Sequence, residues 1–134
     1  MTPFFDTNIL VYAFLDVGKR GRALDLIAAG GTISAQVLNE FTQVARRKFG
    51  LAPNDVREIL GVVRQTVTVE PLTVETHDLG IALSLKYSFS VYDAMIVASA
   101  LRCNAATLYS EDMQHGVVVE RRLRIVNPFG KGKP

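Results

Sequence analysis

The stretch Pro3-Phe4-Phe5-Asp6-Thr7-Asn8-Ile9-Leu10-Val11-Tyr12-Ala13-Phe14 opens the chain with an apolar run, a polar break and a second apolar run. This order predicts a short buried strand that passes directly into a helix, with Asp6 or Thr7 as the helix N-cap. The sequence therefore predicts a βα unit at the N-terminus, with an acid at the junction between strand and helix.

The rest of the chain alternates between helical and strand patterns. Apolar periodicity, caps and glycines predict helices over residues 19–29, 34–49, 53–63, 75–86 and 90–101. Short apolar runs predict strands over 32–33, 67–69, 106–109 and 123–126. Parallel strands need crossover connections, which are normally helical. We therefore predict an α/β fold, with helices on both faces of a central parallel sheet of about five strands.

Size and composition indicate one globular domain over residues 1–134, with a loose basic tail from about residue 128. Of the 134 residues, 49% are hydrophobic and 21% are charged, which is typical of a folded domain. The single cysteine, Cys103, excludes an internal disulfide and fits a reducing compartment. No signal-peptide pattern and no apolar run long enough to span a bilayer is present. We expect a soluble cytoplasmic protein with no membrane segment.

The formal net charge of +2 is too small to mark a protein that binds nucleic acid through charge alone. Two basic clusters stand out, one at Arg46-Arg47-Lys48 and one formed by Arg121, Arg122, Arg124, Lys131 and Lys133. Either cluster can contact phosphates, or it can be a solvated helix face and a loose tail.

Four carboxylates occupy places that a sheet of this kind would bring together: Asp6, Glu40, Asp93 and Asp112. Asp6 follows the first strand, Glu40 lies in the helix after the second, Asp93 begins the apolar helix, and Asp112 follows the fourth strand. In open α/β sheets, sites form beyond the carboxyl ends of the strands. Hard divalent cations are held by several oxygen ligands at once. The pattern predicts a site for Mg²⁺ or Mn²⁺.

Each acid also has a structural explanation. Asp6 can be an N-cap, Asp93 can occupy the third helical position of a capping box that starts at Ser90, and Asp112 can be a turn residue. Glu40 has no cap to satisfy, and its alternative is a solvated position in a polar stripe with Gln36, Gln43 and Arg47. The isolated histidines, His77 and His115, have no second ligand at metal-binding spacing and are expected to be structural or solvent-facing.

Four segments carry a family resemblance: Asp6-Thr7-Asn8-x-Leu10, Ser34-x-Gln36-x-Leu38-x-Glu40-Phe41, Tyr92-Asp93-Ala94-x-Ile96 and Ser110-x-Asp112. In their order and spacing the sequence resembles the PIN-domain family, and in particular its VapC-like toxin ribonucleases. The resemblance implies a three-layer α/β/α sandwich and RNA cleavage that depends on Mg²⁺ or Mn²⁺. It also implies a homodimer and a small cognate antitoxin that inserts into the acidic groove.

The resemblance also assigns roles to residues. Asp6, Glu40, Asp93 and Asp112 match the family's acidic positions, and Asn8 and Ser110 match its polar supporting positions. We expect Asp6 and Asp93 to bind or bridge the main metal, and Glu40 and Asp112 to complete its shell directly or through water. Where many members have a further acid, this chain has His115, which leaves open whether a second metal binds.

Other functions fit the sequence less well or remain open. A receiver-type phospho-acceptor domain needs paired acids after its first strand, where this chain has only Asp6. A phosphatase of the haloacid-dehalogenase type needs an acid at position 8, which is Asn8. A housekeeping RNA-processing or decay nuclease, and a non-catalytic PIN-like domain for protein or RNA binding, both remain open.

Overall fold

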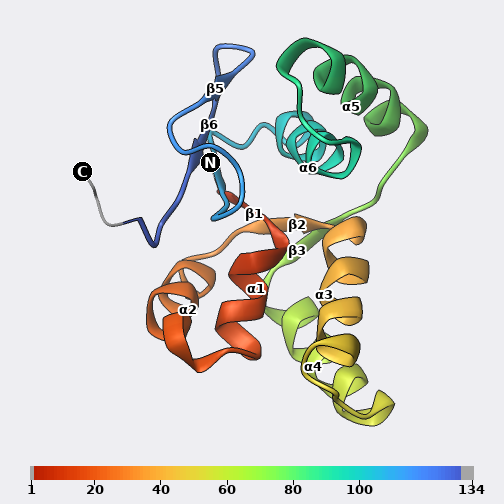
Figure 1. The fold of residues 1–134 in the computed structure, drawn as a ribbon, viewed down its shortest axis with the longest axis vertical. Helices are drawn as coiled ribbons and strands as arrows, with labels where there is room; N and C mark the ends of the chain where they lie inside the picture. The colour runs from red at the N-terminus through yellow and green to blue at the C-terminus, as the bar shows by residue number, and fades with distance from the viewer. Residues whose placement is uncertain (1, 131–134) are drawn as a thin grey trace.

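Helices and short strands alternate along most of the chain in the computed structural model, which describes residues 2–130 (Figure 1). The helices are α1 (Thr7–Phe14), α2 (Arg20–Ala28), α3 (Ala35–Arg47), α4 (Pro53–Thr66), α5 (Val74–Tyr87) and α6 (Val91–Arg102), with a 3-10 turn, η1 (Val17–Lys19), before α2. The strands are β1 (Phe4–Phe5), β2 (Thr32–Ser34), β3 (Thr68–Glu70), β4 (Thr107–Tyr109), β5 (Val118–Val119) and β6 (Leu123–Val126).

The strands form one six-stranded sheet in the order β3-β2-β1-β4-β6-β5. Neighbouring strands are parallel, except that β5 runs antiparallel to β6. The prediction of about five parallel strands was therefore wrong by one strand. β5 has only two residues, and its turn to β6 holds Glu120 and Arg121 at φ angles of 51° and 62°. Such turns usually carry Asn or Gly, so residues 120–122 carry no hairpin signal that could be recognised from the sequence.

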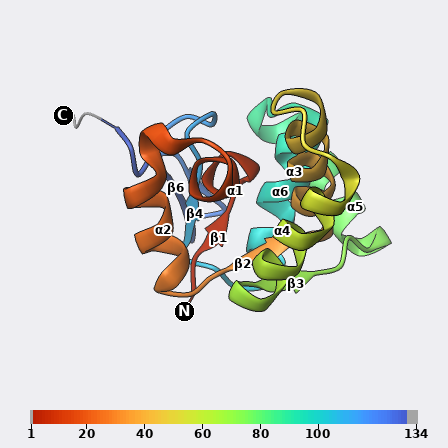
Figure 2. The same cartoon turned by 90° about the horizontal axis from the view of Figure 1, so that it is seen from below.

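Helices cover both faces of the sheet, which confirms the predicted α/β/α order of layers. α2 lies on one side of the sheet, and α5 and α6 lie on the other (Figure 2). α6 contacts β2 and β4, and all its residues from Ala94 to Leu101 are buried. An apolar helix of this kind is stable only in such a position.

Helix starts follow the capping residues that the sequence predicted. Asp6 is the N-cap of α1, and Ser34, Thr73 and Ser90 each accept a hydrogen bond from a backbone N–H in the first turn of α3, α5 and α6. Gly31, between α2 and β2, permits close packing, because a Cβ there would lie 2.3 Å from the ring of Phe5. These local signals set where each helix begins relative to the sheet.

The end of the described chain stays against the domain. Phe129 packs edge-on against Tyr12, with ring centroids 5.0 Å apart. Residues 131–134 of the expected basic tail, which include Lys131 and Lys133, lie outside the described residues. Within residues 2–130, no single helix is long and apolar enough to cross a membrane. Only α5 and α6 taken together reach that length and apolar character, and the chain bends by 117° between them.

Candidate functional site

The carboxyl ends of β1 and β4 meet at the middle of the sheet and define the candidate site. The two strands are parallel neighbours, with Phe5 in register with Tyr109. The next residues along each strand are therefore adjacent, and the N–H of Asp6 donates to the carbonyl of Tyr109 at 2.9 Å. Asp6 and Ser110 thus meet where the sequence predicted a site for an α/β sheet.

Asp6 is buried, with 5% of its surface exposed, and both of its carboxylate oxygens accept hydrogen bonds. Oδ1 accepts from the N–H of Thr7 at 2.7 Å, and Oδ2 accepts from the hydroxyl of Ser110 at 2.6 Å. The Ser110 hydroxyl in turn accepts from the N–H groups of Asp112 and Met113. The same side chain therefore caps α1 and belongs to the acidic site.

Asn8 connects α1 to the loop after β4. Its side-chain amide donates to Asp112 at 3.1 Å and to Oδ2 of Asp6 at 3.4 Å, and its side-chain carbonyl accepts from the N–H of Glu111 at 3.2 Å. Asn8 and Ser110 thus hold Asp6 and Asp112 in a fixed relation. The supporting role that the resemblance implied for them stays a prediction.

Glu40 reaches the same region from the second turn of α3. One carboxylate oxygen accepts from the hydroxyl of Thr7 at 2.5 Å, and the other accepts from the side-chain amide of Gln36 at 3.1 Å. The same amide nitrogen of Gln36 lies 3.0 Å from the carbonyl oxygen of Tyr92. Gln36 is therefore a positioning residue that ties Glu40 to the first turn of α6, where Asp93 lies.

The roles of Thr7 and Gln36 were not predicted. Both belong to visible motifs, and Gln36 was expected in a polar stripe, but it is buried, with 8% of its surface exposed. Their partners lie 33 and 56 residues away along the chain. No local pattern reports such contacts, so only the fold reveals them.

The acids influence one another's charge. Burial raises the pKa of Asp6 to about 6, against the opposing effect of the hydrogen bonds from Ser110 and Thr7, and the charges of Asp93 and Asp112 raise it further. Burial also raises the pKa of the half-buried Asp93, with further contributions from the charges of Asp112 and Glu40. All four predicted acids therefore belong to one electrostatically coupled cluster, hereafter the acidic cluster.

The donor chemistry of the acidic cluster suits a hard divalent cation. All four charged side chains present oxygen ligands, and the two ion pairs among the described residues, Lys19–Glu111 and Lys86–Glu120, include none of them. Within residues 2–130, however, no three acidic, histidine or cysteine side chains are grouped closely enough to enclose an ion in this conformation. The acids are thus brought together and coupled, but they are not closed around a cation.

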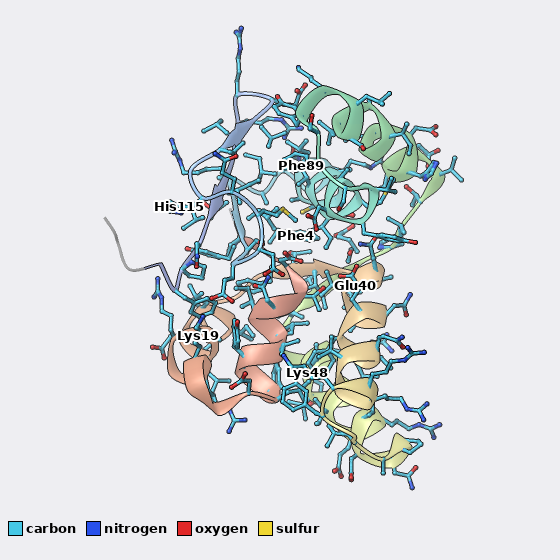
Figure 3. All side chains as sticks on the ribbon, viewed as in Figure 1. Phe4, Lys19, Glu40, Lys48, Phe89 and His115 are labelled. Carbon is cyan, nitrogen blue, oxygen red and sulfur yellow. The ribbon has the colours of Figure 1, made fainter. Side chains whose placement is uncertain are left out.

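The other candidates from the sequence lie outside the acidic cluster. His115 accepts a hydrogen bond from the N–H of Asn127 through Nδ1, at 3.0 Å, and so links the turn before β5 to the segment after β6. Figure 3 places His115 on the opposite side of the site from Glu40. Arg122 bonds to the carbonyl of Leu101, at the other end of α6 from Asp93. The thiol of Cys103 is half-buried, and burial raises its pKa.

Two grooves meet at Glu40. The first, the α1–α3 groove, has a volume of about 440 Å³ and is lined by Thr7, Asn8, Val11, Tyr12, Asp16, Glu40, Val44, Lys48 and Asp112. Lys48, the residue after the end of α3, lies well away from Glu40 (Figure 3). The second, the Tyr92 groove, has a volume of about 390 Å³ and is lined by Gln36, Asn39, Glu40, Gln43, Leu72 and Tyr92. An extended ligand that crosses the acidic cluster can therefore enter a groove on each side.

Solved structures with a similar fold come from toxin systems. A toxin–antitoxin complex from Klebsiella pneumoniae aligns with a TM-score of 0.74 and 21% identity, over 96% of this chain and 98% of that one. VapBC2 from Rickettsia felis, bound to a DNA fragment from its promoter, aligns with a TM-score of 0.70 and 20% identity, over 95% and 100%. Mycobacterium tuberculosis VapC20, a toxin that cleaves the sarcin–ricin loop, aligns with a TM-score of 0.68 and 18% identity, over 83% and 92%.

The sequence itself was also compared with family models and with curated proteins. No curated protein matches it. The model of the PIN domain matches residues 4–118, which include β1, all four acids and the supporting residues Asn8 and Ser110. This match covers most of the chain and agrees with the observed α/β/α layers. The chain therefore belongs to the PIN domain family.

Proposed function

We propose that this protein is a metal-dependent endoribonuclease and the toxin component of a type II toxin–antitoxin pair. The observation that carries the nuclease proposal is the acidic cluster, in which four carboxylates share one rim of the sheet and none forms an ion pair within residues 2–130. A phosphodiester repels an attacking hydroxide, so a site that cleaves it must supply positive charge, which carboxylates do by binding metal ions.

The proposed cofactor is Mg²⁺ or Mn²⁺. When bound, such an ion neutralises phosphate charge and lowers the pKa of a coordinated water. Asp6 and Asp93 would bind or bridge the ion, and Glu40 and Asp112 would complete its shell directly or through water. Ser110 and Asn8 donate hydrogen bonds that keep Asp6 and Asp112 aimed at the site. Thr7 and Gln36 do the same for Glu40.

These residues support direct hydrolysis of RNA. Water attacks phosphorus in line with the leaving 3′-oxygen, so we expect one product to carry a 5′-phosphate and the other a 3′-hydroxyl. The 2′-hydroxyl is not the nucleophile in this scheme. The residues of the chain orient the carboxylates, and the adjacent grooves hold the RNA on either side of the cleaved bond.

The direct test is RNA cleavage by the purified protein with added Mg²⁺ or Mn²⁺ and with excess EDTA. We expect cleavage only with metal, and a loss of at least 100-fold in the Asp6→Asn variant, since removing one essential ligand cripples such a site. Asp25→Asn, an exposed acid on α2, is the matched control and should keep full activity. Sequencing of the product ends identifies the leaving group.

Three outcomes would contradict the nuclease proposal: cleavage that persists in EDTA, 2′,3′-cyclic phosphate on the products, or full activity in a folded Asp6→Asn variant. The first two would exclude metal-assisted hydrolysis. The third would remove Asp6 from the site.

The toxin assignment is supported by the similar structures, two of which come from toxin–antitoxin assemblies. The partner would be a small antitoxin protein whose segment enters the acidic cluster and blocks RNA. Expression of the chain should arrest growth, and co-expression of a small reading frame directly upstream should relieve the arrest. If no neighbouring product binds or inhibits the nuclease, an RNA-processing or decay role replaces the toxin assignment.

A homodimer is part of the same proposal. Val74, Ile81 and Leu85 recur at positions i, i+7 and i+11 of α5 and are 73%, 37% and 82% exposed. Apolar side chains repeated along one exposed helix face are typical of an interface. Sedimentation of the purified chain should give twice the mass of 14.7 kDa, and Leu85→Asp should reduce that mass to the monomer.

A further inference from the structure

The Tyr92 groove differs from the acidic cluster in its chemistry. Its walls include two exposed apolar side chains, Tyr92 at 69% and Leu72 at 43% exposure. None of the lysines and arginines in the described part of the chain lines it. Phosphate groups therefore have no cationic partner in this groove, whereas a flat apolar group has a surface to pack on.

The aromatic ring is held close to the catalytic acids. Tyr92 directly precedes Asp93, and the carbonyl of Tyr92 is bonded to Gln36, which also bonds Glu40. The backbone that carries the ring is therefore fixed to two of the four acids. A base that stacks on Tyr92 would belong to a nucleotide next to the cleaved bond.

The opposite wall offers groups that read a base edge. Asn39 and Gln43 are exposed on α3 and lie four residues apart, so both side chains point to the same face of the helix. Each amide offers a hydrogen-bond donor and an acceptor, as recognition of an unpaired base requires. The groove thus combines a stacking surface with polar groups that can distinguish bases.

The next hollow along α3 is lined by positively charged side chains. It has a volume of about 320 Å³ and is lined by Gln43, Arg46 and Arg47. Gln43 belongs to both hollows, so they are contiguous. Proteins commonly bind single-stranded nucleic acids by stacking the bases on aromatic side chains and by placing basic side chains beside the phosphates.

We propose that the Tyr92 groove is a base-binding subsite for single-stranded RNA. The base next to the cleaved phosphate stacks on Tyr92, its edge meets Asn39 and Gln43, and the following phosphate binds Arg46 or Arg47. The inference rests on the proposed ribonuclease function and adds the path of the RNA along α3 and the residues that select its sequence.

The test measures binding of a fluorescent single-stranded RNA to the full chain carrying Asp6→Asn, so that cleavage does not interfere. Stacking on an aromatic side chain contributes enough that Tyr92→Ala should weaken binding about tenfold, whereas Tyr92→Phe, which keeps the ring, should bind like the parent. Leu24→Ala, which removes an apolar side chain that is 40% exposed on α2, is the matched control and should have no effect.

An abasic scan of the RNA sharpens the test. At one position beside the cleavage site, removing the base should weaken binding to the parent about tenfold and should cost the Tyr92→Ala variant nothing further. Such coupling identifies the base that contacts the ring. In the active chain, Tyr92→Ala should raise KM and change kcat much less.

Failure of this inference is distinct from failure of the proposed function. If Tyr92→Ala and the parent bind RNA equally while the active chain still cleaves it, the subsite is wrong and the nuclease stands. If Tyr92→Ala instead reduces the sedimenting mass and leaves the RNA affinity of the subunit unchanged, the groove is an interface between copies of the chain. Absence of cleavage by the wild-type chain would overturn the nuclease proposal itself.

Discussion

At the scale of single residues, Asp6 is both the N-cap of α1 and a member of the acidic cluster. One oxygen caps α1 through the N–H of Thr7, and the other faces Ser110 and Asn8. The sequence offered the cap and the site as alternatives, and the structure supports the cap while placing the residue in the acidic cluster. Burial raises the free energy of the ionised carboxylate relative to the protonated form, and the first prediction follows from this.

In EDTA, the free energy of unfolding should fall as the pH rises from about 4 to about 7. The pKa of Asp6 is raised from 3.8 to about 6, so the stabilisation from its protonated form is complete below the unfolded pKa and is lost as pH rises through 6. The full loss corresponds to about 3 kcal/mol. Urea unfolding across this range should show the decline in the parent and in Asp25→Asn, and a flatter profile in Asp6→Asn.

An Asp6→Asn variant with the same decline would assign the pH dependence to other groups. Asp93, whose pKa is also raised by burial, is the next group to test with the matching Asp93→Asn variant.

Two buried serines offer a matched pair for the second prediction. The hydroxyl of Ser110 makes three hydrogen bonds, whereas that of Ser99 in α6 has no partner among the described residues. Ser110→Ala should lower the free energy of unfolding by about 1–3 kcal/mol, because it leaves buried polar groups unpaired. Ser99→Ala should change it by less than about 0.5 kcal/mol. Equal effects in urea unfolding would contradict the role assigned to Ser110.

The site residues could be predicted from the sequence as far as local position allowed. Asp6, Asp93 and Asp112 follow a strand or begin a helix, and such ends share one rim in an α/β sheet. Glu40 stood out because no cap explained it. The contacts of Thr7 and Gln36 could not be predicted, since they depend on how α1, α3 and α6 pack together.

At the scale of elements, α5 and α6 pack closely together, and Gly80 lies at their contact. A Cβ at Gly80 of α5 would lie 2.6 Å from the sulfur of Met95, which is buried in α6. Gly61 is exposed in α4, and a Cβ there would meet nothing within 4 Å. Alanine substitution at these two positions compares the effect of crowding on stability with the effect of helix propensity.

Gly61→Ala should raise the free energy of unfolding by about 0.5–1 kcal/mol, because alanine favours the helix. Gly80→Ala should lower it by about 1–3 kcal/mol, because overpacking outweighs the same gain in propensity. Both values come from urea unfolding of otherwise identical chains. A Gly80→Ala variant as stable as Gly61→Ala would show that Met95 moves aside without cost.

Most elements were predictable because each has a local signal. Caps at Ser34, Thr73 and Ser90 and the apolar period of each helix predicted the starts and ends of helices α2 to α6 to within a few residues. The missed strand, β5, has two residues, one of which, Val118, is exposed. Its place depends on pairing with β6, and a two-residue strand has no alternation to detect.

At the scale of the whole molecule, metal binding and folding should be linked. Addition of Mn²⁺ or Mg²⁺ to EDTA-treated protein at pH 7.5 should raise the melting temperature, because only the folded chain brings the acids together. A metal concentration of ten times the Kd contributes about 1.4 kcal/mol, which corresponds to about 5 °C for a domain of this size. The rise should be smaller at pH 5.5, where protons compete for Asp6.

Sodium chloride of matched ionic strength is the control for simple charge screening, and Asp6→Asn should lose most of the effect. A melting temperature that responds equally to sodium chloride and to Mn²⁺ would argue against a formed metal site.

The bonds from Asp6 to Ser110 and from Asn8 to Asp112 each join residues that are 104 positions apart. During synthesis Asp6 and Asn8 leave the ribosome first, and their partners follow only 104 residues later. A nascent or prematurely terminated chain that ends before Thr107 therefore has no β4 to complete the sheet, and on the proposed function it should cleave no RNA. The nuclease activity that we propose would thus appear only after the segment around Ser110 has been made and has joined the N-terminal strand.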